Sequence, residues 1–72
     1  FIFSGRLEID YINEKYILSL PESDEYETLA GMILYYNGSI PKNNDTIRIK
    51  NIVIKVLRAT PTRLDLISLK AE

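Results

Sequence analysis

The stretch TIRIKNIVIKVLRA, residues 46–59, decides the fold, because apolar and charged residues alternate on both sides of a polar dipeptide. Alternation over four or more residues is typical of a β-strand with one buried face. If the dipeptide Lys50-Asn51 forms a two-residue hairpin turn, four isoleucines come to lie on one face of an antiparallel pair. The residues predicted to face the core in this hairpin are Ile47, Ile49, Ile52 and Ile54.

A further apolar run over residues 63–69 follows a proline-containing turn and predicts a last strand, which completes an antiparallel meander. The simplest register pairs Ile67 with Ile54 on the buried face. That register would also bring Asp65 into the core. A β-bulge at Asp65–Leu66 would relieve this conflict, and we expect one there.

The first part of the chain predicts a strand and a helix. Residues 1–4 are aromatic and β-prone, which favours a short first strand. Ile9, Ile12 and Tyr16 follow at spacings of three and four, which is typical of one face of a helix. We therefore expect a short helix over residues 8–15.

A second helix is predicted over residues 26–37 from a full amphipathic stripe at i, i+3, i+4 and i+7. Asp24 and Glu27 have the spacing of a capping box at its start, and Gly38 is the expected left-handed cap at its end. Tyr35 lies beside the stripe and is expected to be an exposed partner contact. The stripe consists of Leu29, Met32, Ile33 and Tyr36.

Together these elements predict one small α+β domain over residues 1–72, with the order β-α-α-β-β-β and an antiparallel C-terminal meander packed on two helices. Hydrophobic residues make up 46% of the chain, which is enough for a core. Cysteine and histidine do not occur in the sequence, so disulfides, Cys/His zinc sites and thiol or imidazole catalysis are excluded. No apolar run approaches the roughly 20 residues of a transmembrane helix, so direct membrane insertion by this fragment is not expected.

Charge is balanced overall but divided along the chain. The net charge is −1. Residues 1–36 carry two basic and seven acidic side chains, whereas residues 37–72 carry seven basic and three acidic ones. A dedicated nucleic-acid binder is usually strongly basic, so we expect no nucleic-acid partner.

Five basic residues form the candidate interaction face. Arg48, Lys50 and Lys55 alternate with the core-facing isoleucines, and Arg58 and Arg63 flank the second turn. On the open side of the meander they could dock an acidic partner or a phosphate group, and the alternative is an ordinary solvated surface.

The acidic run before the second helix could suggest a cation site, but the calcium-loop pattern is absent and neighbouring side chains diverge. We expect no metal site there, and no carboxylate pair indicates catalysis. Gly31, inside a predicted helix, is explained by close packing of that helix against the sheet or the first helix, with backbone approach to a ligand as the alternative. The acidic run contains Glu22, Asp24, Glu25 and Glu27.

Four segments resemble the CorC/HlyC-type transporter-associated domain, also called the CorC_HlyC domain. They are residues 3–7 (FSGRL), 20–21 (LP), 26–31 (YETLAG) and 38–41 (GSIP), and the resemblance covers essentially all 72 residues. Family members often have glycine where this chain has Asn44, a residue that tolerates the left-handed conformation.

The resemblance implies a cytoplasmic domain of a bacterial inner-membrane protein, and a chain that begins at Phe1 is expected to be its C-terminal fragment. In such proteins the domain follows a pair of CBS domains and a membrane domain linked to magnesium and cobalt efflux, and some carry the label "hemolysin". We therefore expect a non-catalytic regulatory or interaction domain that contacts the CBS pair and membrane domain of its own chain or a second copy as a homodimer.

The family fold is also similar to part of the FAD-binding domains of flavin oxidases. A module that binds FAD or an adenine nucleotide is therefore the alternative, and a structural or dimerisation cap is a third hypothesis. The glycines do not have the G-x-G-x-x-G or P-loop spacing that cradles phosphates, so tight flavin binding by this fragment is not expected.

Overall fold

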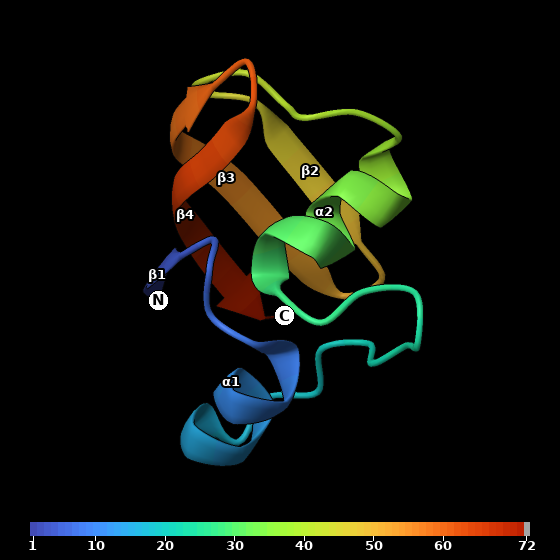
Figure 1. Cartoon of the computed structure of the whole chain (residues 1–72). Coiled ribbons are helices and arrows are strands. Elements are labelled where there is room, and N and C mark those ends of the chain that lie inside the picture. The colour runs from blue at the N-terminus through green and yellow to red at the C-terminus, as the bar shows by residue number, and fades with distance from the viewer. Residues whose placement is uncertain (72) are drawn as a thin grey trace.

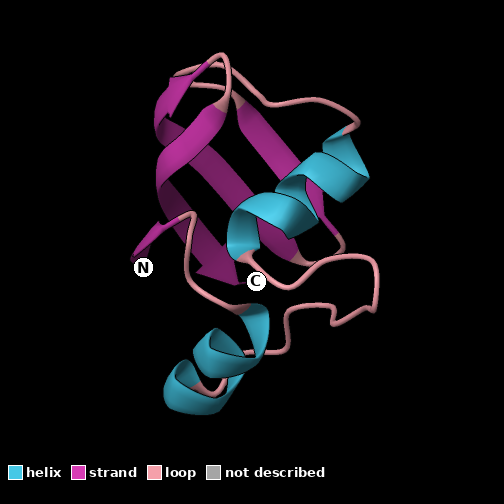
Figure 2. Cartoon of the chain, in the orientation of Figure 1, coloured by secondary structure: helices cyan, strands magenta, loops and turns pink. Residues whose placement is uncertain are grey.

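The computed structural model describes residues 1–71 and contains four strands and two helices (Figure 1). The strands form one antiparallel sheet in the order β1-β4-β3-β2, and both helices precede the β2–β4 meander in the chain (Figure 2). The predicted α+β class and element order are confirmed. The elements are β1 (Ile2–Ser4), α1 (Ile9–Tyr16), α2 (Leu29–Asn37), β2 (Thr46–Ile49), β3 (Ile52–Thr60) and β4 (Arg63–Ala71).

The β2–β3 hairpin has the predicted register. Ile49 pairs with Ile52 and Ile47 pairs with Ile54, so the turn contains only two residues. The first turn residue, Lys50, adopts the left-handed conformation with φ 54°, as two-residue hairpin turns require. Sequence alone therefore determines this pairing correctly.

The pairing of β4 differs from the predicted register by two residues. Ile67 lies opposite Val56 and Leu69 lies opposite Ile54, whereas the sequence pattern pairs Ile67 with Ile54. This difference has a physical reason. β3 and β4 are joined by a two-residue turn, with Thr60 opposite Arg63, and the length of this turn fixes which residues of the two strands pair. As a result Asp65 is not opposite Val56.

Two irregularities interrupt the β3–β4 pairing. Arg58 pairs with Leu66 and Ala59 pairs with Leu64, so the register includes neither Leu57 of β3 nor Asp65 of β4. The bulge predicted at Asp65–Leu66 is therefore present. Because each strand contains one unpaired residue, the two shifts in register cancel. The pairing near the turn therefore has the same register as the pairing farther along the strands.

The N-terminal strand and α1 agree with the predictions to within one residue. β1 joins the edge of the sheet beside β4, with Phe3 opposite Ile67. α1 spans 9–16 instead of 8–15, and Ile9 and Ile12 are buried on the predicted face, with Tyr16 partly buried. Within residues 1–71, neither helix is long and apolar enough to cross a membrane.

α1 ends in an unusual way. Ile17 has a left-handed backbone (φ 54°) and its side chain is 88% exposed, although β-branched residues rarely adopt this conformation. The following chain is tied back to the helix, because the Asn13 side-chain amide donates to the Leu20 carbonyl and accepts from the Leu20 amide. These two hydrogen bonds hold the turn in place despite its strain.

α2 begins at Leu29, three residues later than predicted. Its N-cap is Thr28, whose hydroxyl oxygen accepts a hydrogen bond from the Gly31 amide at 3.1 Å. The capping box assigned to Asp24 and Glu27 is therefore wrong. The Thr-x-x-Gly segment within residues 26–31 is itself the helix cap.

Contacts with the rest of the chain keep the residues before Thr28 out of the helix. The Glu27 carbonyl accepts a hydrogen bond from the Ile9 amide at 2.8 Å, and the Tyr26 hydroxyl donates to the Pro21 carbonyl at 2.6 Å. A Cβ atom added to Gly31 would lie 3.1 Å from the Tyr26 Cβ. Close packing therefore explains Gly31, against this segment and not against α1 or the sheet.

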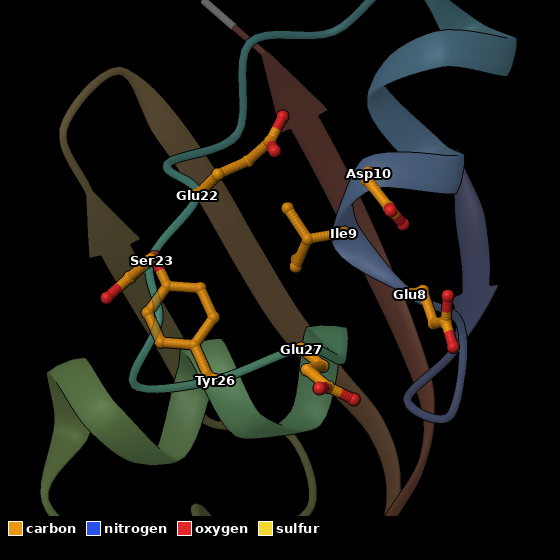
Figure 3. A pocket seen from close by; sticks show the side chains of 7 residues that line it. All are labelled: Glu8, Ile9, Asp10, Glu22, Ser23, Tyr26 and Glu27. Atoms are coloured by element: carbon orange, nitrogen blue, oxygen red, sulfur yellow. The ribbon is translucent and has the colours of Figure 1, made fainter.

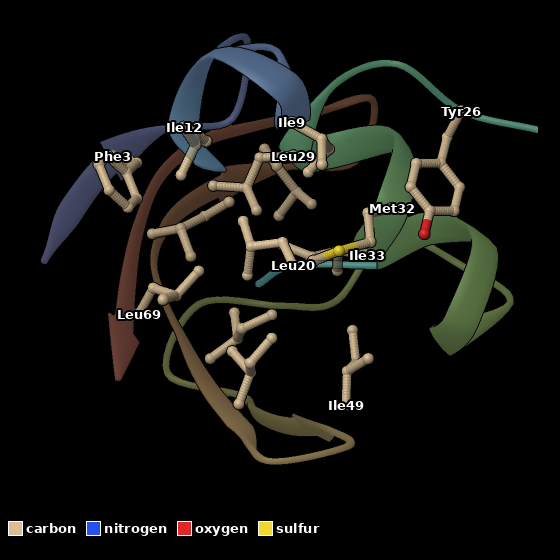
Figure 4. Close-up of a cluster of buried hydrophobic side chains, with 14 of the residues drawn as sticks. Phe3, Ile9, Ile12, Leu20, Tyr26, Leu29, Met32, Ile33, Ile49 and Leu69 are labelled. Carbon is tan, nitrogen blue, oxygen red and sulfur yellow. The ribbon is translucent and has the colours of Figure 1, made fainter. Parts of the chain in front are cut away.

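The core lies between the helices and one face of the sheet (Figure 4). Seven residues of the α2 stripe and the β2–β3 hairpin are predicted for it, and the seventh of them, Ile47, is partly buried. The six that are buried are Leu29, Met32, Ile33, Ile49, Ile52 and Ile54. Tyr36 is 44% exposed instead of completing the buried stripe, because its ring packs against Tyr26 and Tyr35. The buried residues are Phe3, Ile9, Ile12, Leu20, Tyr26, Leu29, Met32, Ile33, Ile49, Ile52, Ile54, Val56, Leu64, Ile67 and Leu69.

Candidate interaction surface

The face of the sheet turned away from the core carries a row of basic residues. Arg48 of β2 lies opposite Val53 of β3, which in turn lies opposite Lys70 of β4. Residues directly opposite each other in antiparallel strands point to the same side of the sheet. Arg48 and Lys70 are exposed and Val53 is partly buried, so this row is accessible to a partner.

A second row crosses the same face. In this row Lys55 lies between Thr46 of β2 and Ser68 of β4. Nearer the β3–β4 turn, Arg58 of β3 lies opposite Leu66 of β4. The strands fix the backbone positions of these residues, so their side chains project from a rigid sheet. We call this side of the sheet the open face, and its residues are Ile2, Ser4, Thr46, Arg48, Val53, Lys55, Arg58, Leu66, Ser68 and Lys70.

The other two predicted residues lie at opposite ends of the sheet. Lys50 occupies the β2–β3 turn, whereas Arg63 begins β4 at the far turn and lines a hollow together with Arg6. The structure therefore brings three of the five predicted residues onto the open face and adds Lys70. Lys70 lies one residue beyond the predicted end of the final strand at Leu69, whereas β4 continues to Ala71.

A shallow acidic depression lies on the helical side of the molecule (Figure 3). It has a volume of about 360 Å³ and contains four carboxylates, which Figure 3 shows spaced around it and not converging on one point. Among residues 1–71, no three carboxylates gather closely enough to hold a metal ion. We call this depression the acidic hollow, and it is lined by Glu8, Ile9, Asp10, Glu22, Ser23, Tyr26 and Glu27.

Three tyrosines form a cluster beside the acidic hollow. The ring centroids of Tyr26 and Tyr35 are 5.5 Å apart, and those of Tyr35 and Tyr36 are 5.2 Å apart. Burial raises the pKa of Tyr26 to about 12, and Tyr36 contributes in the same direction. Tyr35 is 55% exposed, as predicted, and lies where a partner could reach it.

A second hollow, of about 370 Å³, lies between the start of α2 and the β3–β4 turn. Its floor is largely apolar, and arginines from two different segments line it. Sequence analysis gave no sign of it, because its residues are far apart in the chain. We call it the arginine hollow; its main lining residues are Arg6, Ala30, Leu34, Ile40, Arg63 and Leu64.

Comparison with known proteins places this geometry in a family. The family model of the CorC_HlyC transporter associated domain matches residues 1–72. A Rickettsia canadensis protein named "Possible hemolysin C" is 33% identical over 70 residues, which are 96% of this chain and 24% of that protein. The chain thus spans about a quarter of the length of that relative.

Two solved structures share the fold. The Mg2+ and Co2+ transporter (CorC) associated region of Neisseria meningitidis MC58 has a TM-score of 0.86 at 22% identity, over 99% of this chain and 86% of that one. A CorC_HlyC domain of a Xylella fastidiosa hemolysin, in complex with Mg++ and Mn++, has a TM-score of 0.78 at 25% identity, over 99% and 85%. The matching family is defined as a transporter associated domain and not as a catalytic one. The chain therefore belongs to the CorC_HlyC family of transporter associated domains.

Proposed function

We propose that this domain is a non-catalytic regulatory or interaction module of an ion-transport-associated membrane protein, and that its open face docks on an acidic surface. The observation that carries the proposal is the alignment of Arg48, Lys55, Arg58 and Lys70 on one side of a rigid sheet. Fixed charges of this kind steer and orient a partner, and their effect weakens as salt rises.

Family membership supports the rest of the proposal. The related region from Neisseria meningitidis is named as associated with a Mg2+ and Co2+ transporter, and the curated relative is named "Possible hemolysin C". We propose that the parent protein is of this class, that it holds the domain on the cytoplasmic side of a bacterial inner membrane, and that a CBS-domain pair of the same chain supplies the acidic surface.

The charge-reversal variant Lys55→Glu/Arg58→Glu in the full-length parent tests this proposal. Both side chains are exposed and neither is in the core, so folding should be retained. We expect ion transport to lose its normal regulation at low and at moderate salt. Lys42→Glu, an exposed reversal in the loop before β2, is the matched control and should behave like the wild type. Wild-type regulation in the double variant at both salt concentrations would refute the proposal.

Binding of FAD or an adenine nucleotide remains the alternative, with less support from the geometry. A phosphate at a helix start needs free backbone amides. At the start of α2 the Leu29 and Ala30 amides donate to the carbonyls of Leu7 and Gly5, each at 2.9 Å, and the Gly31 amide is bonded to Thr28. We expect no flavin to copurify with the domain, and stoichiometric visible absorbance would promote this alternative.

A further inference from the structure

We propose that the arginine hollow binds an apolar side chain presented by an acidic segment of a partner protein, with Arg6 and Arg63 pairing with the carboxylates on either side. This site lies apart from the open face and does not depend on the function proposed for it.

The floor of the hollow provides the apolar contact. Ala30 and Leu34 project from successive turns of α2, and Ile40 and Leu64 complete the surface. The Leu34 side chain is 45% exposed. The hollow has a volume of about 370 Å³, which is larger than a single aliphatic side chain requires. This volume falls within the range of about 300–1,000 Å³ found for ligand sites.

The charges at the hollow are of one sign. Arg6 and Arg63 are both exposed, no acidic residue lines the hollow, and within residues 1–71 neither guanidinium group makes a hydrogen bond or ion pair. A guanidinium group matches a carboxylate with two parallel hydrogen bonds. The complementary ligand therefore carries carboxylates close to an apolar group.

The two arginines are held near each other by the backbone. Gly5, which precedes Arg6, lies so close to β4 that any added Cβ would collide with the Leu64 carbonyl oxygen. The Gly5 amide also approaches the Asp65 carbonyl, at 3.4 Å. The segments that carry Arg6 and Arg63 are thus in direct contact, and the fold fixes the backbone positions from which the two arginines project.

The polar groups of the hollow favour a protein segment over a small molecule. Small-ligand sites orient their ligand with a few well-placed buried donors and acceptors. Here the amides at the start of α2 are already bonded within the chain, and among residues 1–71 no buried side-chain polar atom lacks a partner. What remains for recognition is a largely apolar floor, two arginines and the hydroxyl groups of Thr28 and Thr62. This combination suits an apolar residue flanked by acidic ones.

Selection from a random ten-residue peptide library on the 72-residue chain tests this inference. We expect the enriched peptides to place acidic residues on both sides of an apolar one. Their affinity should fall at least tenfold for Arg6→Gln/Arg63→Gln and also for Leu34→Asp. Circular dichroism checks that each variant is folded. If the Leu34→Asp variant does not fold, Leu34→Ser replaces it.

The control variant is Lys55→Gln/Arg58→Gln, which removes two charges from the open face and should leave peptide binding unchanged. A loss of binding in this control alone would assign the peptides to the open face and overturn the inference. The inference is equally overturned if no peptide is enriched, if acidic residues are not preferred, or if the Arg6/Arg63 variant binds normally. AMP and inorganic phosphate are added as competitors, and arginine-dependent binding of either without peptide binding would show a small-anion site instead.

Discussion

Replacing Ile33 by alanine tests how α2 packs on the sheet. The Ile33 side chain is completely buried at 0% exposure. Its truncation removes buried apolar area and leaves a cavity, which together cost about 2–5 kcal/mol. A domain of this size has a free energy of unfolding of about 4–11 kcal/mol, from about 0.05–0.15 kcal/mol per residue. The substitution should therefore remove a large part of the total stability.

The neighbouring Leu34, which is 45% exposed, provides the matched control. Leu34→Ala should cost only about 1 kcal/mol, because nearly half of its side chain is already in water. Urea unfolding followed by circular dichroism measures both values, and Ile33→Ala should also melt at least about 8 °C lower than the wild type. Equal losses in the two variants would refute this orientation of α2. If Ile33→Ala does not fold, Ile33→Val with an expected loss of about 0.5–1.5 kcal/mol replaces it.

Four further predictions concern the caps, a buried tyrosine and metal binding. Thr28→Ala should lower the free energy of unfolding by about 0.5–2 kcal/mol, whereas Asp24→Ala should change it little. A larger loss for Asp24→Ala than for Thr28→Ala in urea unfolding would indicate that Asp24 caps the helix. Ile17→Gly should raise stability by about 0.5–1 kcal/mol, because relief of about 1–2 kcal/mol of left-handed strain exceeds the entropic cost of glycine, and a lower melting temperature would contradict this. The raised pKa of Tyr26, about 12 against about 10 when unfolded, means that its contribution to stability is complete below pH 10 and is lost as the pH rises towards 12; Tyr26→Phe should show a smaller fall over that range. Millimolar Mg2+ should shift the melting temperature by less than about 1 °C, and a rise of several degrees would show a cation site.

The sequence predicts the β2–β3 hairpin correctly because its information is local. Alternation fixes which residues face the core, and a two-residue turn fixes the pairing of Ile49 with Ile52. The β4 register could not be obtained in this way. A shift of two residues leaves every side chain on the same face, so the hydrophobic pattern allows Ile67 opposite either Ile54 or Val56. The choice depends on the length of the turn and on two compensating bulges.

The start of α2 shows a second limit of local reasoning. Asp24 and Thr28 are both good N-cap residues, so the sequence permits a helix from either. The structure selects Thr28 because the Glu27 carbonyl is occupied by the Ile9 amide, a contact with a distant segment. Long-range contacts of this kind determine where an element begins.

The two candidate sites show the same difference between local sequence information and long-range contacts. Arg48 and Lys55 belong to the local alternation and lie on the open face as the pattern predicts. The arginine hollow joins Arg6, Leu34 and Arg63, which are brought together only by tertiary structure. No sequence signal links these residues, so the hollow could be found only in the folded chain.

Chemical-shift mapping of the 15N-labelled chain tests the proposed docking surface most directly. The unlabelled partner is the CBS-domain pair of the parent protein, added at low salt. We predict that the largest amide shifts fall on the open face, around Arg48, Lys55, Ser68 and Lys70, and that they diminish at moderate salt. Shifts confined to α2 and the hollows, or no shifts at all, would contradict the proposal that the open face is the docking surface.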